Sequence, residues 1–460
     1  MKNLTVVAAV LVGLSFSILS GSADAQIANN VDLLGYLPLQ SPNSWIADIW
    51  GYTDATGEYA LVCMGDAGLA VIDVNDPYHP VVVSTIPSVG EDLKDVKVYQ
   101  HYAYAVNESG PLHIVDLSDP YDAQLVGVYD ATFSGAHNLY IEGHYAYVVG
   151  THPPARWGIN ILDLSNPTEP VEVGSWDKVY IHDVYVRNDT AYASAIYEPG
   201  SLRIIDVSDK SNPSEIAAIY YPGAVTHQAW TTEDGDYVLV ADETWGGHVR
   251  IWDIRDLDNI IQVGEYMTSS NVSIHNVFVK GDYAYIAYYR DWLRILDISD
   301  PSNPTEVGVY DLNPDNTGYL MSDVWAVYPY SPSGVVHISC MFPPNSGFYT
   351  LQFSRIKTVN IEHTPWTDTQ DTAGPYPVTA AVFLGPGNEL AGSSPQLVYG
   401  TDGVFTDSTL MEATGNPDEY GAHIPGAGGV ADITYYISAT DTSGRRVTHP
   451  PAGAPNTYHT

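Results

Sequence analysis

The stretch Ile251-Trp252-Asp253-Ile254 is one copy of a short phrase that decides the fold of this chain. The phrase places two residues of high β-propensity before an aspartate and a third hydrophobic residue after it. Six copies occur, and their aspartates lie 43, 47, 43, 47 and 44 residues apart. The copies are Val71-Ile72-Asp73-Val74, Ile114-Val115-Asp116-Leu117, Ile161-Leu162-Asp163-Leu164, Ile204-Ile205-Asp206-Val207, Ile251-Trp252-Asp253-Ile254 and Ile295-Leu296-Asp297-Ile298. A period of about 40 to 50 residues, made of short strands and turns, is typical of propeller blades.

A second phrase, centred on Asp, Asn or Gln, runs in step with the first. Its seven copies are Ala47-Asp48-Ile49, Lys94-Asp95-Val96, His137-Asn138-Leu139, His182-Asp183-Val184, His227-Gln228-Ala229, His275-Asn276-Val277 and Ser322-Asp323-Val324. Successive copies are 47, 43, 45, 45, 48 and 47 residues apart. Together with the turn residues between the hydrophobic runs, they predict seven units of four antiparallel strands.

An outer-strand phrase, hydrophobic-Gly-x-aromatic, predicts how the units are joined. It occurs at Leu125-Val126-Gly127-Val128-Tyr129 and Val307-Gly308-Val309-Tyr310, and again before the first unit at Leu33-Leu34-Gly35-Tyr36. The seventh unit ends at 348–353 without an outer strand of its own. We therefore predict that residues 31–37 supply that strand, which closes a seven-bladed β-propeller and removes two exposed sheet edges.

The two ends of the chain predict export and a second domain. Lys2, an apolar run from Leu4 to Leu19 and the small-residue site Ala23-Asp24-Ala25 indicate a signal peptide over residues 1–25. We expect the propeller over 26–355 and, where the period stops, a small β-sandwich over 356–460. A membrane-spanning helix needs about 18 consecutive apolar residues, and no later stretch is that apolar over such a length. We therefore expect a secreted protein without membrane insertion.

Composition supports an all-β class and excludes one kind of partner. The chain of 460 residues has 39 Gly, 31 Pro and 35 Tyr, and only 16% of its residues are charged. Its net charge of −38 argues against nucleic acid as a partner, because few cations are available to neutralise phosphates. Cations, neutral glycans and proteins remain as ligands, and we expect a monomer.

Longer motifs resemble a known family. The repeat phrase is similar to the LVIVD repeat, and several stretches are similar to the choice-of-anchor B family. These stretches are 226–235, Ala241-Asp242-Glu243, 274–281, 293–301 and 327–334. The resemblance implies an extracellular or surface-displayed bacterial β-propeller with no established activity. The second domain resembles Ig-like or fibronectin-like modules. Asp291-Trp292 departs from the family pattern, which usually has a glycine there. No anchor signal precedes Thr460, which leaves a truncated sequence open.

Four histidines occupy the same repeat position, and two interpretations of them stay open. His137, His182, His227 and His275 should form an arc at one mouth of the channel, with Ser322, Ala47 and Lys94 completing the circle. Converging neutral imidazoles could bind zinc, copper or manganese. Alternatively, repeated polar residues serve only hydrogen bonds between strands or blades, which we favour for the histidines and for the Asp/Asn/Gln position beside them. The aspartates of the first phrase precede turn residues, so we expect them to cap turns.

The loops after the second strands differ from unit to unit, so they suggest a ligand-binding rim. The candidate residues there are Arg156, Trp157, Tyr197, Glu198, Glu243, Trp245, Arg290 and Trp292. Aromatic faces mixed with carboxylates and arginines suit a glycan or protein ligand. A metal-dependent lyase or oxidase and a pure scaffold are the alternatives, and calcium at scattered carboxylates has no predicted location. We expect Cys63 and Cys340 to be free buried thiols.

Overall fold

The computed structural model describes residues 27–460 except 41–44, 153–156, 198, 314–319, 354–358, 365–372, 385–388, 402–403, 427–432, 441, 443–445, 450–457 and 460. The predicted signal peptide therefore lies outside the described residues. Apart from one short 3-10 helix, η1 (Pro120–Asp122), the regular elements of the described residues are β-strands. The chain is divided between residues 353 and 354 into two compact units. Among the described residues, no helix has the length and apolar character to span a membrane.

The described part of the first unit contains seven antiparallel sheets, six with four strands and one with five. The strands of each sheet follow the order of the chain, except that the two N-terminal strands join the last two sheets. The strands of the first three sheets are β3 (Ile49–Asp54), β4 (Gly57–Cys63), β5 (Leu69–Asp73) and β6 (Val81–Ile86); β7 (Leu93–Tyr99), β8 (Tyr102–Asn107), β9 (Leu112–Asp116) and β10 (Gln124–Tyr129); β11 (Asn138–Glu142), β12 (Tyr145–Val149), β13 (Ile159–Asp163) and β14 (Val171–Trp176). The next two comprise β15 (Asp183–Arg187), β16 (Thr190–Ala195), β17 (Ser201–Asp206) and β18 (Ser214–Ile219); β19 (Thr226–Thr231), β20 (Tyr237–Asp242), β21 (Val249–Asp253) and β22 (Ile261–Tyr266). The last two comprise β23 (Asn276–Lys280), β24 (Tyr283–Ala287), β25 (Leu293–Asp297) and β26 (Thr305–Asp311), with β1 (Ile27–Asn29) added to β26; and β27 (Val324–Tyr328), β28 (Val336–Cys340), β29 (Gly347–Phe353) and β2 (Val31–Pro38).

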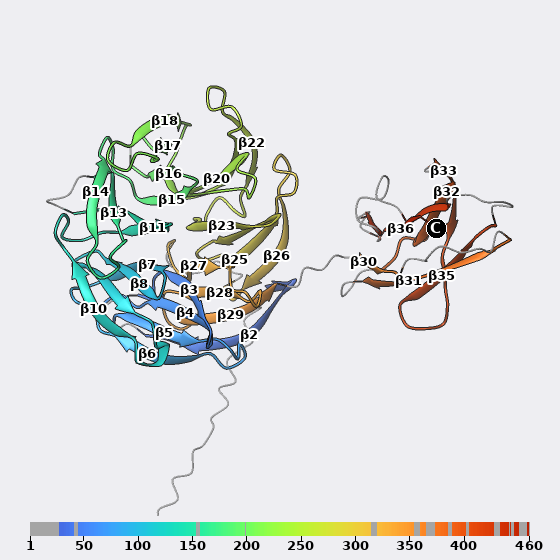
Figure 1. Ribbon diagram of the computed structural model, residues 1–460, viewed down its shortest axis with the longest axis horizontal. Helices are drawn as coiled ribbons and strands as arrows, with labels where there is room; N and C mark the ends of the chain where they lie inside the picture. Colours follow the sequence, from blue (N-terminus) through green and yellow to red (C-terminus); the bar gives the residue numbers. More distant parts are fainter. Residues whose placement is uncertain are drawn as a thin grey trace, which may run out of the picture. The chain divides into compact units, whose positions relative to one another are not determined.

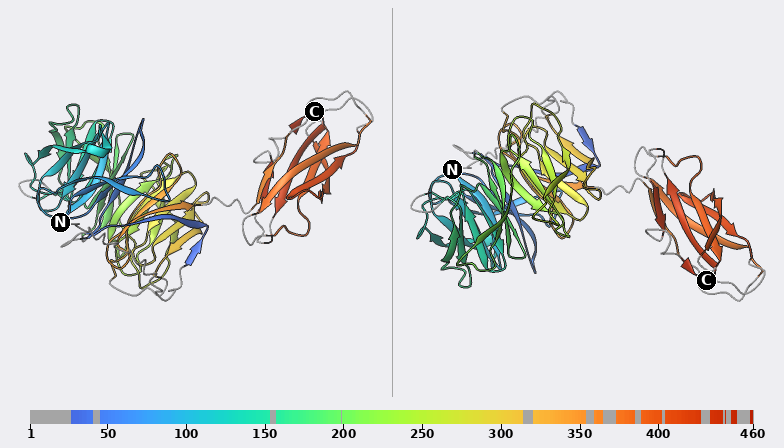
Figure 2. Two further views of the ribbon diagram at one scale, coloured as in Figure 1. Left: turned by 90° about the horizontal axis from the view of Figure 1, so that it is seen from below. Right: turned by 90° about the horizontal axis from the view of Figure 1, so that it is seen from above.

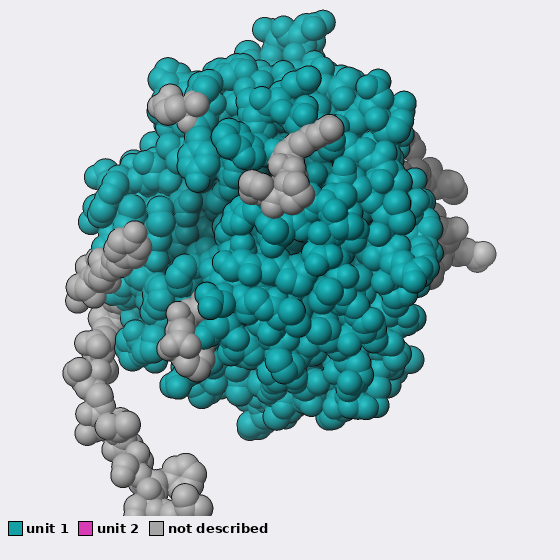
Figure 3. All heavy atoms as spheres, turned by 90° about the vertical axis from the view of Figure 1, so that its left-hand side faces the viewer, with its two compact units in different colours: residues 1–353 teal, residues 354–460 magenta. Residues whose placement is uncertain are grey.

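The sheets are arranged around a common centre, with their first strands innermost (Figure 1). Figure 2 shows the same strands from below and from above. These strands contact one another in succession from β3 through β7, β11, β15, β19 and β23 to β27, and β27 contacts β3. Large buried side chains such as Tyr104 and Tyr147 fill the space between sheets, because strands covered on both faces carry apolar residues on both. Figure 3 shows one side of this unit with its heavy atoms as spheres.

Strand β2 pairs with β29, as the outer-strand phrase predicts. Val31 lies opposite Phe353 and Pro38 opposite Gly347, with a register shift between Leu33 and Gly35. The outer pairs of the other six sheets contain the same kind of shift. A Cβ on Gly35 would lie 2.5 Å from the carbonyl oxygen of Pro77, in the turn before β6. The glycine is therefore required because the backbone of the neighbouring sheet approaches so closely.

The aspartates of the repeat phrase cap turns, which confirms the prediction for all six copies. Each Oδ1 accepts a hydrogen bond from the backbone N–H two residues later, at 2.7 to 3.1 Å. This local bond satisfies a donor where the third strand ends, so the aspartate ends the strand and starts the turn. The repeat aspartates are thus structural.

The second unit has two sheets of its own. One contains β30 (Val359–Glu362), β31 (Tyr376–Leu384), β35 (Glu419–Ile424) and β34 (Glu412–Ala413). The other contains β33 (Val404–Leu410), β32 (Gln396–Thr401), β36 (Ile433–Thr440) and β37 (Arg446–His449), and β38 (Tyr458–His459) also pairs with β36. A separate core that includes Val378, Leu397 and Tyr435 lies within this unit.

Candidate functional site

The four repeat histidines lie where the first strands of four consecutive sheets begin. The backbone N–H of His137 donates to Val149, that of His182 to Ser194 and that of His275 to Ala287, each the last or next-to-last residue of a second strand. His227 lies at a register shift between Thr226 and Gln228. Equivalent backbone positions therefore bring the four side chains to the same end of the sheets.

The imidazole rings form the arc that the sequence predicts. Ring centroids are 4.1 Å apart for His137 and His182, 4.6 Å for His182 and His227, and 4.3 Å for His227 and His275. The Trp325 ring continues the arc, 4.3 Å from His275. We call these four histidines and Trp325 the mouth layer.

The rest of the circle differs from the prediction. The register shift between Val324 and Ala326 places Trp325 beside the histidines, where we expected Ser322. Trp45, rather than Ala47, supplies the next ring, 6.2 Å from Trp325. The Lys94 ammonium lies 3.8 Å from the Trp45 ring centroid and is held there by a cation–π contact.

Two glutamates from the loops flank the mouth layer. The Glu108 carboxylate contacts His137 Nδ1, and its second oxygen lies 3.6 Å from His152 Nε2. Burial opposes ionisation of Glu108, but His137, Lys94 and His152 outweigh it and lower its pKa. Glu243 Oε2 lies 3.9 Å from His227 Nε2, and the Tyr289 hydroxyl donates to Glu243 Oε1 at 2.5 Å. Burial raises the pKa of Glu243 to about 7, although the Tyr289 hydrogen bond lowers it in part.

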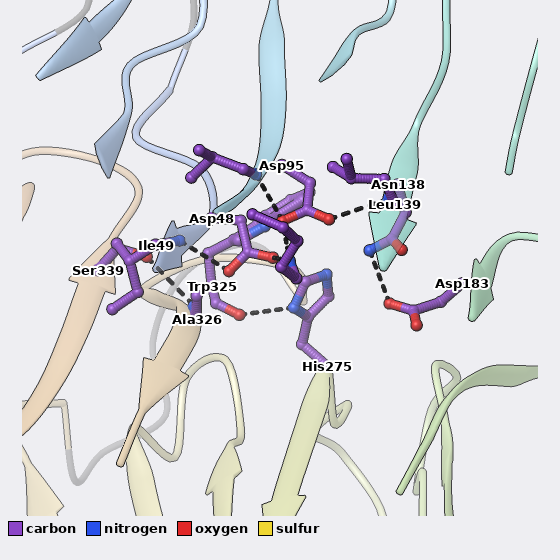
Figure 4. Close-up of polar contacts among 12 residues, drawn as sticks. Asp48, Ile49, Asp95, Asn138, Leu139, Asp183, His275, Trp325, Ala326 and Ser339 are labelled. Carbon is purple, nitrogen blue, oxygen red and sulfur yellow. Dashed lines mark hydrogen bonds and ion pairs between the residues drawn. The ribbon is translucent and has the colours of Figure 1, made fainter. Parts of the chain in front are cut away.

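The residues that follow the histidines have a different role. Asp95 Oδ2 accepts from the backbone N–H of Leu139, and Gln228 Oε1 accepts from that of Val277, at 3.1 and 2.7 Å. In both cases the donor belongs to the first strand of the next sheet. The amide of Asn138 likewise donates to Asp183 Oδ2 at 2.9 Å (Figure 4). We call Asp48, Asp95, Asn138, Asp183, Gln228 and Asn276 the latch layer, because three of these contacts fasten one sheet to the next.

Lys97 places a positive charge in the latch layer. Its ammonium contacts Asp95 Oδ1 and lies 3.9 Å from Asp48 Oδ2, and the side chain is buried. Burial lowers the pKa of Lys97, but the two carboxylates outweigh burial and raise it overall. Burial, with the negative charge of Asp95, raises the pKa of Asp183 to about 8 and that of Asp48 well above its usual range. The layer is therefore a coupled set of buried charges.

The loops after the second strands expose three aromatic side chains. Trp157, Tyr197 and Trp245 are 64%, 67% and 62% exposed. The Trp157 carbonyl accepts from Ile181 N–H, and Gly246 N–H donates to Val272, so both loops border the strands that carry His182 and His275. The Tyr197 ring lies 4.9 Å from Tyr180, whose ring lies 6.2 Å from His182. We call Trp157, Tyr197 and Trp245 the aromatic rim.

Two residues that we predicted at the ligand-binding rim are buried. Trp292 is fully buried, because left-handed backbone at Tyr289 and Trp292 (φ 42° and 60°) turns the loop inward. Its indole packs edge-on against Tyr349 and Tyr310, so it offers no face to a ligand. Arg290 is also buried, with its guanidinium 6.0 Å from the Trp245 ring centroid. Arg156 and Glu198 lie outside the described residues.

The mouth layer brings together donor atoms that could hold a metal. Donor atoms of His137, His182 and His227 all lie within 4.8 Å of one another, and so do those of His227, Glu243 and His275. A cavity of about 10 Å³ lies beside them, and its lining includes Lys94 and residues of both layers, among them His137, His227 and His275. The two cysteines, Cys63 and Cys340, are free buried thiols, as the sequence predicts.

Sequence reasoning missed Trp325 and Lys97, and it missed the contact between Tyr289 and Glu243. Trp325 and Lys97 stand in ordinary strand patterns, and only a register shift or a long buried side chain brings them to the centre. Tyr289 reaches Glu243 across a separation of 46 residues, for which the sequence contains no spacing signal.

Comparison with known proteins identifies the repeat. Five stretches match the LVIVD repeat family, at residues 54–86, 90–131, 135–178, 183–219 and 273–312. The chain is therefore a propeller-like repeat protein. Among solved structures, a candidate 6-phosphogluconolactonase from Bacteroides uniformis is 13% identical with a TM-score of 0.49, over 60% of this chain and 88% of that one. No curated protein matches the sequence.

Proposed function

We propose that this chain is an exported, seven-bladed propeller that binds a glycan at the mouth bordered by the aromatic rim. Two observations support the architecture: the first strands contact one another in a cycle, and β2 supplies the outer strand beside β29. The signal-like segment and the resemblance to the choice-of-anchor B family support export and display. The second unit, which we take to be an Ig-like or fibronectin-like sandwich, would act as a spacer or presenter.

The observation that carries the binding proposal is the exposure of the aromatic rim. Single exposed aromatics are ordinary, but here loops of three consecutive sheets each expose one at the same end. Aromatic faces stack on the apolar faces of sugar rings, and buried carboxylates such as Glu243 accept hydrogen bonds from hydroxyls. The net charge of −38 disfavours an anionic ligand.

A matched pair of variants tests this proposal. Trp245→Ala and Trp157→Ala should each weaken binding to a neutral glycan about tenfold, measured by calorimetry after screening on a glycan array. Tyr78→Ala is the control, because Tyr78 is 61% exposed but lies in the turn between β5 and β6, at the opposite end of the sheets. Equal losses for Trp245→Ala and Tyr78→Ala would contradict the proposal. If the chain bound a protein and no glycan, the proposed ligand would have to be a protein and not a glycan.

A further inference from the structure

Two neighbouring imidazoles in the mouth layer have nitrogens without a partner. Among the described residues, His182 Nδ1 and His227 Nδ1 are buried and make no hydrogen bond. An unpaired buried polar atom costs about 1 to 3 kcal/mol, so proteins rarely retain one without a use. Here two such atoms belong to rings with centroids 4.6 Å apart. A bound ligand that accepts a nitrogen lone pair would satisfy both.

The outer two imidazoles are held in one orientation by acceptors. His137 Nδ1 faces the Glu108 carboxylate, and His275 Nδ1 lies 2.5 Å from the Trp325 carbonyl oxygen. An acceptor at Nδ1 requires the proton there, which leaves the lone pair on Nε2. Carboxylates and backbone carbonyls fix metal-binding histidines in this way.

The distances are close to those of a bound ion. The donor atoms of His137, His182 and His227 are within 4.8 Å of one another. Tetrahedral bonds of about 2.05 Å to zinc would set nitrogens about 3.4 Å apart. Ring movements of about 1 Å would therefore bring all three onto one ion. The alternative group, His227 with Glu243 and His275, contains only one of the two residues with an unpartnered nitrogen.

The charges around the triad include one carboxylate and one ammonium. Glu108 lies against His137 and offsets part of the charge of an ion, and Lys94 belongs to the lining of the cavity beside them.

We propose that His137, His182 and His227 bind one Zn²⁺ ion, with Glu108 orienting His137 from outside the coordination sphere. Three neutral imidazoles match the donor set of zinc sites that keep a fourth position for water or a ligand oxygen. His137 and His182 are only half-buried, so the fourth position is on the mouth side. This inference does not depend on the glycan proposal, because it concerns the ion alone.

Metal content of the untagged full-length chain tests the site. After stripping with a chelator and reloading with Zn²⁺, the wild type should retain about one zinc per chain through gel filtration, as measured by plasma mass spectrometry. His182→Asn and His137→Gln should each weaken zinc binding at least about 100-fold, and Glu108→Gln about tenfold. His275→Asn should retain zinc, which separates this triad from the alternative one. The exposed His79→Asn serves as the matched control.

Cobalt gives a second readout that does not depend on activity. Co²⁺ in place of zinc should give the visible absorption of a tetrahedral site in the wild type and in His79→Asn, and not in His182→Asn. Circular dichroism establishes whether each variant is folded. If His182→Asn does not fold, His137→Gln takes its place in the comparison. Absence of stoichiometric zinc in the wild type would overturn the proposal. Loss in His275→Asn with retention in His182→Asn would also overturn it.

Discussion

The mouth layer and the latch layer come from adjacent residues of the same strands, yet their polar atoms are used differently. In the latch layer, Asp95 and Gln228 accept hydrogen bonds from the backbone of the next sheet. In the mouth layer, His182 and His227 leave nitrogens unpaired, and in the latch layer Asn138 Oδ1 and Asn276 Oδ1 are also unpaired. Both layers repeat from sheet to sheet, so repetition alone does not distinguish structure from function. The hydrogen bonds that join one sheet to the next mark Asp95 and Gln228 as structural.

The largest expected effect is on the charge balance of the latch layer. Lys97→Met leaves the Asp95 carboxylate, which Lys97 contacts, buried without its cation, so we expect the free energy of unfolding to fall by about 3 to 5 kcal/mol. Urea denaturation followed by tryptophan fluorescence measures this, since nine of the ten tryptophans precede residue 354. The exposed Lys178→Met is the control. A loss below about 1 kcal/mol would show that the latch layer does not hold the sheets together.

A buried histidine outside both layers provides a pH test. His337 Nε2 and Ser331 Oγ share a hydrogen bond of 2.8 Å. Burial lowers the pKa of His337 to about 3. The unfolded state, with a pKa of about 6.5, binds a proton that the folded state does not, so stability is complete above pH 6.5 and is lost as pH falls. Between pH 7 and 5, His337 should account for a loss of about 2 kcal/mol.

The variant His337→Phe isolates this contribution. Its free energy of unfolding should change less between pH 7 and 5 than that of the wild type, by the same amount of about 2 kcal/mol. The comparison uses the difference between two pH values, so a constant effect of the substitution cancels. An unchanged pH dependence would mean that His337 is protonated in the folded protein.

The smallest expected effect is the destabilisation caused by His182→Asn, and its comparison with Gln228→Ala separates the two layers. Gln228→Ala leaves the buried N–H of Val277 without its acceptor and should destabilise the metal-free protein by about 1 to 3 kcal/mol. His182→Asn removes a ring whose Nδ1 has no partner and should cost less than Gln228→Ala. Chemical denaturation in the presence of a chelator gives both values. The reverse order would mean that the mouth histidines are structural.

The features of the fold and of the candidate site that the sequence predicts depend on local hydrogen bonds or on the spacing of the repeat. The turn aspartates are predictable because each bonds within two residues, and the histidine arc because equivalent positions in equivalent sheets must converge. The pairing of β2 with β29 is predictable for the same reason, since Gly35 repeats the outer-strand phrase.

The parts that the sequence does not predict depend on departures from that phase. Trp325 enters the mouth layer through a register shift, and left-handed residues turn Trp292 into the core. Lys97 reaches two carboxylates by its length alone. The contact between Tyr289 and Glu243 joins two loops whose shapes no repeat determines.

The register of β2 against β29 also determines how the first unit would respond to mechanical load. Val31 lies opposite Phe353, so the chain enters and leaves this strand pair at the same end. Tension applied between residue 31 and residue 353 would pull the two strands apart one hydrogen bond at a time, because these bonds run across the strands. Such a pair opens like a zipper at low force, while the sheets built from consecutive strands carry no part of the load until it has opened.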